Sequence, residues 1–250
     1  MASTANGVDG RVAIVTGGSR GIGRAVVTRL VTGGYSVVVG YGSDRARAET
    51  IVSEATSSGG KAIAAQADVA DEQAVAEMFD LAEQTFGGVD VAVNSAGIMP
   101  LAPLAELNLD VLDRVLRTNV RGTFVVAQQA ARRLRPGGAI INLSSSVVVI
   151  ARPTYDAYAA SKGAVEGLTL TLAHELRGRD VTVNAVAPGP TATDLFFEGK
   201  DDDLIKRIAA EPPLERLGTP EDSAEVIAFL AGPAGHWVNG QVIRANGGIV

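Results

Sequence analysis

Tyr158 and Lys162 stand four positions apart in the segment YDAYAASK (155–162), so a helix would place both side chains on one face. Of the four tyrosines in the chain, Tyr158 alone has a lysine four positions later. A phenol titrates near pH ~10 in isolation, and a nearby ammonium group favours its ionised form. The pair is therefore a candidate for proton transfer, with an exposed surface pair as the alternative.

The composition predicts a globular protein of one domain. Of the 250 residues, 46% are hydrophobic and 20% are charged, which is enough apolar material for a large core. The chain has no cysteine, so it can form neither a disulfide nor a thiolate metal site, and a reducing cytoplasm is the expected location. The two histidines, His174 and His236, are far apart and have no ligand-like neighbours, so we expect no metal.

Charge and hydropathy exclude two classes of partner. The net charge is −6 and there is no long basic run, so we expect no nucleic acid partner. No apolar run has the length of a membrane span, and the first eleven residues lack the apolar core of a signal peptide. We therefore expect a cytoplasmic protein without a membrane partner, in which residues 1–10 form a flexible leader.

Seven apolar runs rich in β-branched residues alternate with helix-like stretches. Such runs are typical of strands that are covered on both faces, as in a parallel sheet. The predicted strands are 11–16, 35–40, 61–66, 89–94, 138–144, 181–186 and 241–246. The alternation predicts an α/β fold over 11–250, with one doubly wound parallel sheet of about seven strands and helices on both faces. The polar segment 194–218 is predicted to be a flap over a site, with a plain surface insertion as the alternative.

A glycine-rich turn joins the first predicted strand to the first predicted helix. TGGSRGIG (16–23) spaces Gly17, Gly21 and Gly23 as Gly-x-x-x-Gly-x-Gly. Glycines permit a tight turn and let the backbone approach a pyrophosphate, which the N-terminus of the following helix stabilises. The turn thus predicts a dinucleotide site, with a ligand-free turn as the alternative.

Six motifs in this order resemble those of the short-chain dehydrogenase/reductase family. They are TGGSRGIG at 16–23, NSAG at 94–97, TNVRGTF at 118–124, INLSSS at 141–146, YAASK at 158–162 and NAVAPGP at 184–190. The resemblance covers residues 11–250 and departs at Ser95, where the family more often has a second asparagine. It implies a single Rossmann-type domain and hydride transfer between a nicotinamide and a carbonyl or alcohol.

The resemblance also implies four catalytic residues. Tyr158 would be the acid/base that protonates the carbonyl oxygen, and Lys162 would lower the pKa of the phenol and bind the cofactor ribose. Asn119 would hold a water in a proton relay, with local hydrogen bonding that bends a helix as the alternative. Ser145 would donate to the substrate oxygen, because the family's serine commonly precedes the tyrosine by thirteen positions. Ser146 is the rival, and capping of a turn is the alternative for the whole serine run.

The remaining implied residues are cofactor contacts. Asp68, after the third strand, would bind the adenine amine, or could instead cap the next helix. The other implied contacts are Gly17, Ser19, Arg20, Gly21, Ile22, Gly23, Tyr41, Arg45, Val69, Asn94, Ala96, Gly97, Tyr158, Lys162, Pro188, Gly189, Thr191 and Thr193.

The end of the second predicted strand favours NADPH over NADH. An NAD enzyme normally has an acid there, which binds the adenosine ribose and repels a 2′-phosphate. That position holds Tyr41, and Asp44 comes three residues later. Arg20 in the glycine turn and Arg45 after the strand could pair with the 2′-phosphate. We therefore expect NADPH/NADP⁺, with solvated arginines and an Asp44 turned toward NAD as the alternative.

The expected protein is an NADP-dependent ketoreductase that acts on a small carbonyl compound or secondary alcohol, and the resemblance implies a homotetramer. The pattern is most similar to 3-oxoacyl-carrier-protein reductases and related ketone reductases. His174 stands where such reductases often have an arginine that docks the carrier protein, which argues against a carrier-protein substrate. Arg132, Arg133 and Arg135 could still form a basic patch, with complementing a helix dipole as the alternative. A NAD-dependent sugar or alcohol dehydrogenase and a non-catalytic nucleotide-binding protein are the alternatives. The sequence leaves the substrate and the stereochemistry open.

Overall fold

One sheet of seven parallel strands forms the centre of the molecule, in the order β3-β2-β1-β4-β5-β6-β7. The structure is a computed structural model that describes Val8 and residues 10–250, so most of the predicted leader lies outside the described residues. The strands are β1 (Val12–Thr16), β2 (Ser36–Tyr41), β3 (Lys61–Gln66), β4 (Val89–Asn94), β5 (Leu134–Leu143), β6 (Val181–Pro188) and β7 (Val242–Ala245). The prediction of about seven parallel strands is confirmed, and only β5 begins clearly earlier than expected.

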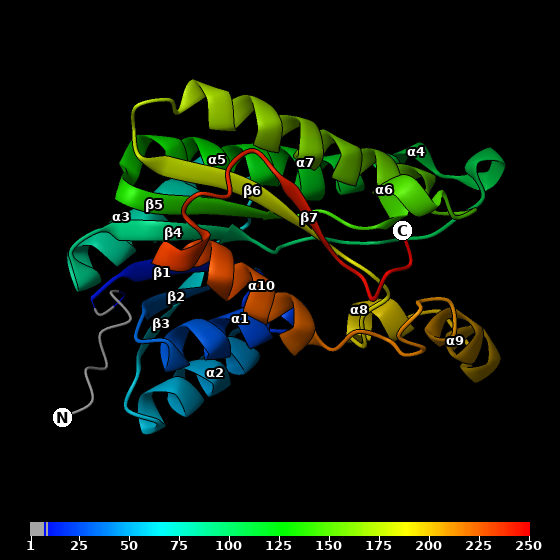
Figure 1. Cartoon of the computed structure of the whole chain (residues 1–250), viewed down its shortest axis with the longest axis horizontal. Helices are drawn as coiled ribbons and strands as arrows, with labels where there is room; N and C mark the ends of the chain where they lie inside the picture. Colours follow the sequence, from blue (N-terminus) through cyan, green and yellow to red (C-terminus); the bar gives the residue numbers. More distant parts are fainter. Residues whose placement is uncertain (1–7, 9) are drawn as a thin grey trace.

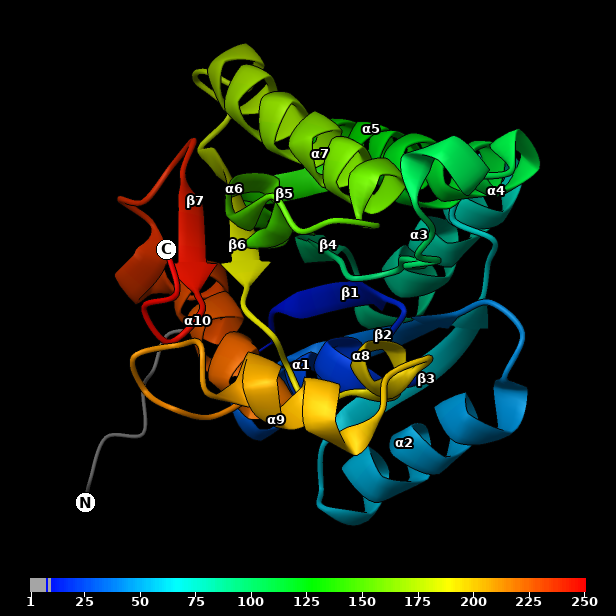
Figure 2. The ribbon, with the colours of Figure 1, turned by 90° about the vertical axis from the view of Figure 1, so that its right-hand side faces the viewer.

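Helices cover both faces of the sheet, as the prediction required (Figure 1). One face carries α1 (Gly21–Thr32), α2 (Arg45–Ser57) and α10 (Pro220–Ala231). The other face carries α3 (Glu72–Phe86), α4 (Leu109–Val115), α5 (Gly122–Arg133) and α7 (Asp156–Glu175), with a π-helical segment, Leu116–Arg121, between α4 and α5 (Figure 2). Within the described residues, no helix is both long and apolar enough to cross a membrane.

The strands inside the sheet are apolar almost throughout because each of them supplies two cores. Ala13 and Val15 of β1 belong to the core beneath α1 and α10, whereas Val12 and Ile14 belong to the core beneath α3 and α5. All four side chains are fully buried. Successive residues of a strand point to opposite faces, so a strand between two helical layers needs apolar side chains at every position.

The strand order reverses at β1, which lies between β2 and β4. In an open α/β sheet the loops on either side of such a reversal separate, and they leave a crevice beyond the carboxyl ends of the strands. The glycine turn after β1 and the loops after β4, β5 and β6 meet at this crevice. The topology therefore places the site at this edge of the sheet.

The segment between β6 and β7 that was predicted as a flap contains two short helices, α8 (Asp194–Phe197) and α9 (Asp202–Ala209). A backbone bridge between Thr191 and Gly218 joins the two ends of the segment. Figure 1 shows α8 and α9 toward the right-hand end of the molecule, and Leu195, Phe196 and Ile208 of these helices line the crevice. We call residues 194–218 the flap.

Candidate active site

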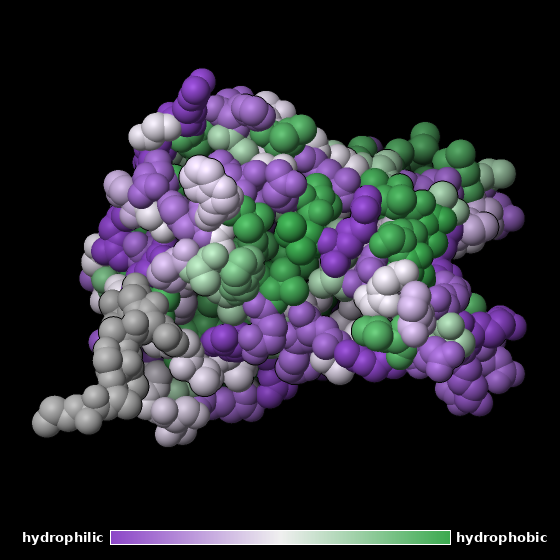
Figure 3. Space-filling view, in the orientation of Figure 1, coloured by the Kyte–Doolittle hydropathy of each residue, from purple (hydrophilic) through white to green (hydrophobic). Residues whose placement is uncertain are grey.

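A cavity of about 570 Å³ occupies the crevice at the carboxyl ends of the strands. In Figure 3 the surface is hollowed on the right-hand side, between the lobe that holds α4 and α6 (Val147–Ile150) and the lobe that holds α8 and α9. Most residues singled out in the sequence line this cavity. They are Gly17, Ser19, Arg20, Gly21, Ile22, Tyr41, Asp68, Val69, Ala96, Gly97, Ser145, Tyr158, Lys162, Pro188, Gly189, Thr191 and Thr193.

The glycine turn fits a dinucleotide because backbone replaces side chains on its inner side. Gly17 has a φ of +63°, and a Cβ there would lie 2.9 Å from the backbone of Ala96. A Cβ on Gly23 would lie 2.2 Å from the carbonyl oxygen of Gly17. Gly23 was predicted to contact the cofactor, but it does not line the cavity; it lets α1 pack against the turn. Arg20 caps α1 without a side-chain hydrogen bond, which leaves the N-terminal amides of α1 free to bind an anion.

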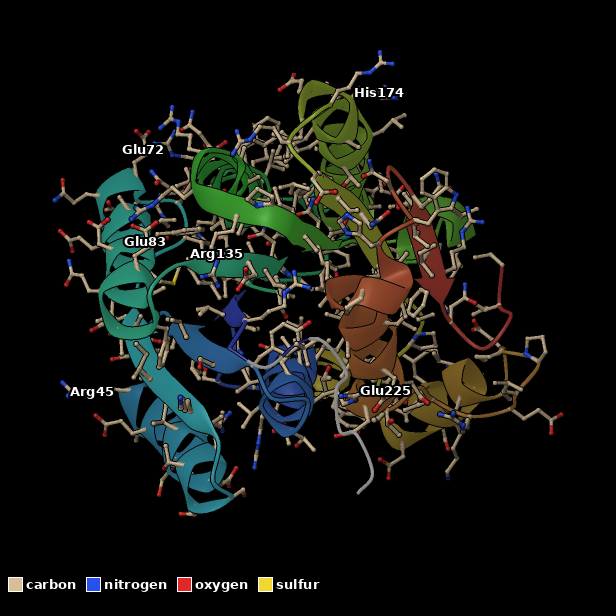
Figure 4. All side chains as sticks on the ribbon, turned by 60° about the vertical axis from the view of Figure 1, so that its left-hand side comes forward. Arg45, Glu72, Glu83, Arg135, His174 and Glu225 are labelled. Atoms are coloured by element: carbon tan, nitrogen blue, oxygen red, sulfur yellow. The ribbon has the colours of Figure 1, made fainter. Side chains whose placement is uncertain are left out.

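Arg47, which the sequence analysis missed, takes the place expected of Arg45 at the cavity. Arg45 pairs with Glu49 and its side chain is 76% exposed, pointing away from the molecule (Figure 4). Arg47 lines the cavity and forms ion pairs of 3.2 Å with both Asp44 and Asp194. Because α2 begins at residue 45, side chains two positions apart point to opposite sides of the helix. Asp44 is engaged as the N-cap of α2, where it accepts a hydrogen bond from the backbone of Arg47.

Asp68 lies at the end of β3 and lines the cavity, and it does not cap α3. The cap is Asp71, whose side chain accepts two backbone hydrogen bonds of the first turn. Asp68 accepts hydrogen bonds from the backbone N–H of Ala70 and from Arg117, the latter at 2.6 Å. Burial acts to raise the pKa of Asp68, but these two donors outweigh it and hold that pKa below its usual value. Its carboxylate is thus an ionised acceptor at neutral pH.

Asn94, predicted to contact the cofactor ribose, is turned into the sheet instead. Its side chain is buried and donates to Asn142 of β5 at 2.7 Å, and Asn142 in turn donates to Thr169 of α7 at 2.9 Å. Asn94 is the last residue of β4, so its side chain alternates away from the cavity while Ala96 and Gly97 face it. It therefore links two strands to a helix.

Asn119 lies in the π-helical segment and is completely buried behind the cavity rather than on its wall. Its amide pairs with both the N–H and the carbonyl of Ile98 at 2.9 Å and donates to Ser161 at 3.0 Å. A Cβ on Gly97 would lie 3.3 Å from Asn119 Oδ1 and 3.8 Å from Lys162 Nζ. The absence of a side chain at Gly97 therefore lets both polar groups approach the cavity.

Tyr158 and Lys162 lie in the first two turns of α7, on the face that meets the end of β5. Lys162 is buried and donates from Nζ to the carbonyl of Leu143 at 2.6 Å. Its Nζ lies 5.6 Å from the centre of the Tyr158 ring. Burial alone lowers the pKa of Lys162 to about 8.

The pKa of the Tyr158 phenol is raised, whereas the resemblance implied that Lys162 would lower it. Burial raises the pKa of Tyr158 to about 12, while a hydrogen bond with Ser145 opposes this rise and the nearby Tyr155 adds to it. The expected lowering by Lys162 is not seen, because the cost of burying a phenolate dominates. In the protein alone the hydroxyl therefore keeps its proton at neutral pH.

The three serines after β5, Ser144 to Ser146, form hydrogen bonds with different partners. Ser144 is buried and donates to Glu166 at 2.6 Å. Ser146 is buried and donates to the carbonyl of Ala187 at 3.2 Å. The Ser145 hydroxyl accepts a hydrogen bond from the backbone N–H of Val147 at 3.4 Å, and Ser145 is the one of the three that acts on the pKa of Tyr158 through a hydrogen bond. Its neighbours are held by structural contacts.

One part of the cavity lining is mainly apolar, and we call it the apolar end. It is lined by Ile98, Met99, Val147, Ile150, Tyr155, Leu195, Phe196 and Ile208. Arg152, which the sequence analysis did not single out, also lines the cavity and forms an ion pair with Glu211 of the flap. The apolar wall comes from both sides of the crevice.

Two of the three arginines considered as a basic patch are paired with acids, while Arg132 is exposed in the last turn of α5, where it complements the helix dipole. Arg133 pairs with Asp80 and Glu83, and Arg135 pairs with Asp90. Figure 4 shows Glu83 and Arg135 on neighbouring elements of the side away from the flap. Their charges are thus balanced by acids of α3 and β4.

A cavity that combines a glycine turn at a helix N-terminus with a half-buried tyrosine and serine and a buried lysine defines a dinucleotide-dependent oxidoreductase. A family model described as enoyl-(acyl carrier protein) reductase matches residues 17–250. The chain is 46% identical to an NADPH-dependent aldehyde reductase-like protein, chloroplastic, of Arabidopsis thaliana, and the match covers 96% of this chain and 94% of the relative. It is 41% identical to the versicolorin reductase stcU of Emericella nidulans, and that match covers 96% of each chain.

A solved short-chain dehydrogenase from Burkholderia cenocepacia J2315 in complex with NADP superposes with a TM-score of 0.91 at 39% identity, over 97% of this chain and 98% of that one. The chain therefore belongs to the short-chain dehydrogenase/reductase family. It is an NADP-dependent oxidoreductase, as the strand-end analysis predicted.

Lys162→Met should raise the melting temperature of the protein at pH 7. A lysine titrates at 10.5 when exposed and at about 8 here, so between these values the unfolded chain binds more protons and stability rises with pH. Below about pH 8 the whole penalty is present, on the order of 3 kcal/mol at most. Thermal unfolding at pH 7 to 10 should show a gain for Lys162→Met that shrinks as the pH increases. Lys206→Met, at a 77% exposed lysine, is the control; a gain of equal size at every pH would contradict this account of the burial.

Proposed function

We propose that the protein is an NADPH-dependent carbonyl reductase in which Tyr158 protonates the carbonyl oxygen of a small, largely apolar ketone or aldehyde. The observation that carries this proposal is the convergence of Ser145 and Lys162 on Tyr158, at the junction of the glycine-turn end and the apolar end of one cavity. The two ends of the cavity then hold cofactor and substrate, and the phenol lies where they meet.

NADPH supplies the hydride when it is bound. Tyr158 gives its hydroxyl proton to the carbonyl oxygen, and Ser145 donates a hydrogen bond to the same oxygen as negative charge develops there. A pKa near 12 keeps the proton on the phenol until it is needed, but it also makes the phenolate costly to form. The ammonium of Lys162, held by Leu143, supplies a positive charge close to the ring that stabilises this phenolate.

Asn119 supports the same group of residues from behind. Its amide fixes Ile98 and Ser161, and Gly97 leaves room between Asn119 and Lys162. The predicted role of Asn119 in a water relay toward Lys162 is compatible with this position and stays a prediction.

Arg20 and Arg47 are the proposed ligands of the 2′-phosphate. Both line the cavity beside Tyr41, which occupies the position where an acid would repel the phosphate. A guanidinium can form two parallel hydrogen bonds with a phosphate. Arg47 replaces Arg45 in this proposal because Arg45 faces solvent.

The flap is proposed to select the substrate. Its residues Leu195, Phe196 and Ile208 form one wall of the apolar end, opposite Ile150. Relatives whose names give aldehyde reductase and versicolorin reductase activities support a small organic carbonyl compound. Docking of an acyl carrier protein is less well supported, since Arg133 and Arg135 are neutralised by acids. The cytoplasmic location stays a prediction.

A homotetramer is the proposed assembly, because exposed apolar side chains of the described residues form two separate faces. One is a stripe along α4 and α5 formed by Leu109, Leu116 and Phe124. The other lies beside the edge strand β7 (Figure 3) and includes Leu170 of α7 and Trp237, which is 99% exposed. Two self-complementary faces assemble four copies.

Tyr158→Phe should lower kcat by about 10²- to 10⁴-fold while the Kd for NADPH stays nearly constant, because the ring remains and the proton donor is lost. Ser145→Ala should lower kcat strongly, whereas Ser146→Ala should mainly lower the melting temperature. Steady-state kinetics, NADPH titration and thermal unfolding of the three variants decide this. Retention of wild-type kcat by Tyr158→Phe would exclude it as the acid, and a larger kcat loss for Ser146→Ala would move the donor role to Ser146.

Arg20→Ala and Arg47→Ala should each lower the ratio of kcat/KM for NADPH to that for NADH by about tenfold, the value of one charge-assisted contact. Arg45→Ala is the matched control, since it removes an arginine two positions from Arg47 that faces solvent. An equal loss for Arg45→Ala, or unchanged ratios for the other two, would contradict the assignment.

Light scattering should give about four times the chain mass of 25.7 kDa. Phe124→Asp and Trp237→Asp should each yield dimers, because each places a charge in one face only. Phe197→Asp, at an exposed position of the flap, should remain tetrameric. A monomeric wild-type protein at micromolar concentration would refute the assembly.

A further inference from the structure

Four polar contacts join the end of β5 to α7. They are Asn142 with Thr169, Leu143 with Lys162, Ser144 with Glu166, and Ser145 with Tyr158. The helix residues 158, 162 and 166 repeat every four positions, so they follow one face of α7. Three of the four contacts involve groups that the fold or the proposed chemistry already uses. The contact between Ser144 and Glu166 has no assigned role.

The Ser144–Glu166 bond has the properties of a strong, directed contact. Its length of 2.6 Å is that of a hydroxyl bonded to a carboxylate, which is about twice as strong as a neutral hydrogen bond. Ser144 is 3% exposed, so water does not compete for the hydroxyl. Glu166 is only partly buried and lies one helical turn beyond Lys162. The Glu166 carboxylate therefore binds the end of β5 at Ser144 and is not part of the apolar core.

On the side that faces β6, backbone hydrogen bonds hold the two neighbours of Ser145. The N–H of Ser144 donates to the carbonyl of Val186 at 2.8 Å, and the N–H of Ser146 donates to that of Pro188 at 2.9 Å. These bonds fix the distance of the run from β6. The bond to Glu166 is the contact that fixes the side chain of Ser144 toward α7.

We propose that Glu166 is a positioning residue: through Ser144 it aims the Ser145 hydroxyl at the carbonyl oxygen of the substrate. This inference rests on the proposed role of Ser145 as the hydrogen-bond donor to that oxygen. Glu166 touches neither substrate nor cofactor in this arrangement. Its effect should therefore appear in kcat and vanish when the Ser145 hydroxyl is absent.

Glu166→Ala should lower kcat at least about tenfold, because small misplacements of an aligned group slow a reaction strongly. KM and the Kd for NADPH should change less than about threefold, since neither ligand contacts Glu166. Glu166→Gln should retain kcat within about threefold, because its amide oxygen accepts the same bond from Ser144. Ser144→Ala should reproduce the loss in Glu166→Ala, and Glu175→Ala, at an exposed glutamate of the same helix, should behave as wild type.

The decisive measurement is a double-mutant cycle. In a Ser145→Ala background, Glu166→Ala should cause no further loss of kcat. An equal loss in both backgrounds, or a parallel rise in the Kd for NADPH, would show that Glu166 acts through Lys162 or the fold and would overturn the inference. If Ser145→Ala itself retains wild-type kcat, the proposed role of Ser145 is wrong and the inference fails with it. If Ser145→Ala is impaired and Glu166→Ala is not, the inference alone is wrong.

Discussion

A buried lysine ammonium holds the carboxyl end of strand β5 to helix α7. Lys162 is 5% exposed and donates to the Leu143 carbonyl, and its burial lowers its pKa to about 8. A charge in this position opposes folding, yet it fixes the distance between the strand end and the helix face that carries Tyr158. The neighbouring contacts of Ser144 and Ser145 follow from this alignment, because they join the same strand end to the same helix face.

The cavity depends on two positions that carry no side chain. Gly17 lets the turn after β1 pass Ala96, and Gly97 leaves space in front of Asn119 and Lys162. A side chain at either position would meet atoms at 2.9 or 3.3 Å, respectively. The dinucleotide end and the catalytic end of the crevice are therefore both shaped by missing side chains at the reversal of strand order.

Among the described residues three ion pairs tie the flap to the rest of the protein, and the two that lie at the cavity differ in their exposure to solvent. Arg47 and Asp194 are 54% and 74% exposed, so solvent screens this pair near the cofactor end. Arg152 and Glu211 are 20% and 38% exposed, so their attraction at the substrate end is screened less. The flap is thus held more firmly beside the apolar pocket than beside the glycine turn.

The sequence by itself determined the sheet, the glycine turn and the tyrosine–lysine pair, because these depend on local periodicity and on spacing within one element. Only the tertiary structure decided which way individual side chains point. Arg47 rather than Arg45 reaches the cavity because of where α2 begins, and Asn94 turns into the sheet because of the alternation along β4. The raised pKa of Tyr158 also required the fold, since burial depends on residues that are distant in the chain. Spacing brings groups to one face of an element, but the packing of elements decides what that face meets.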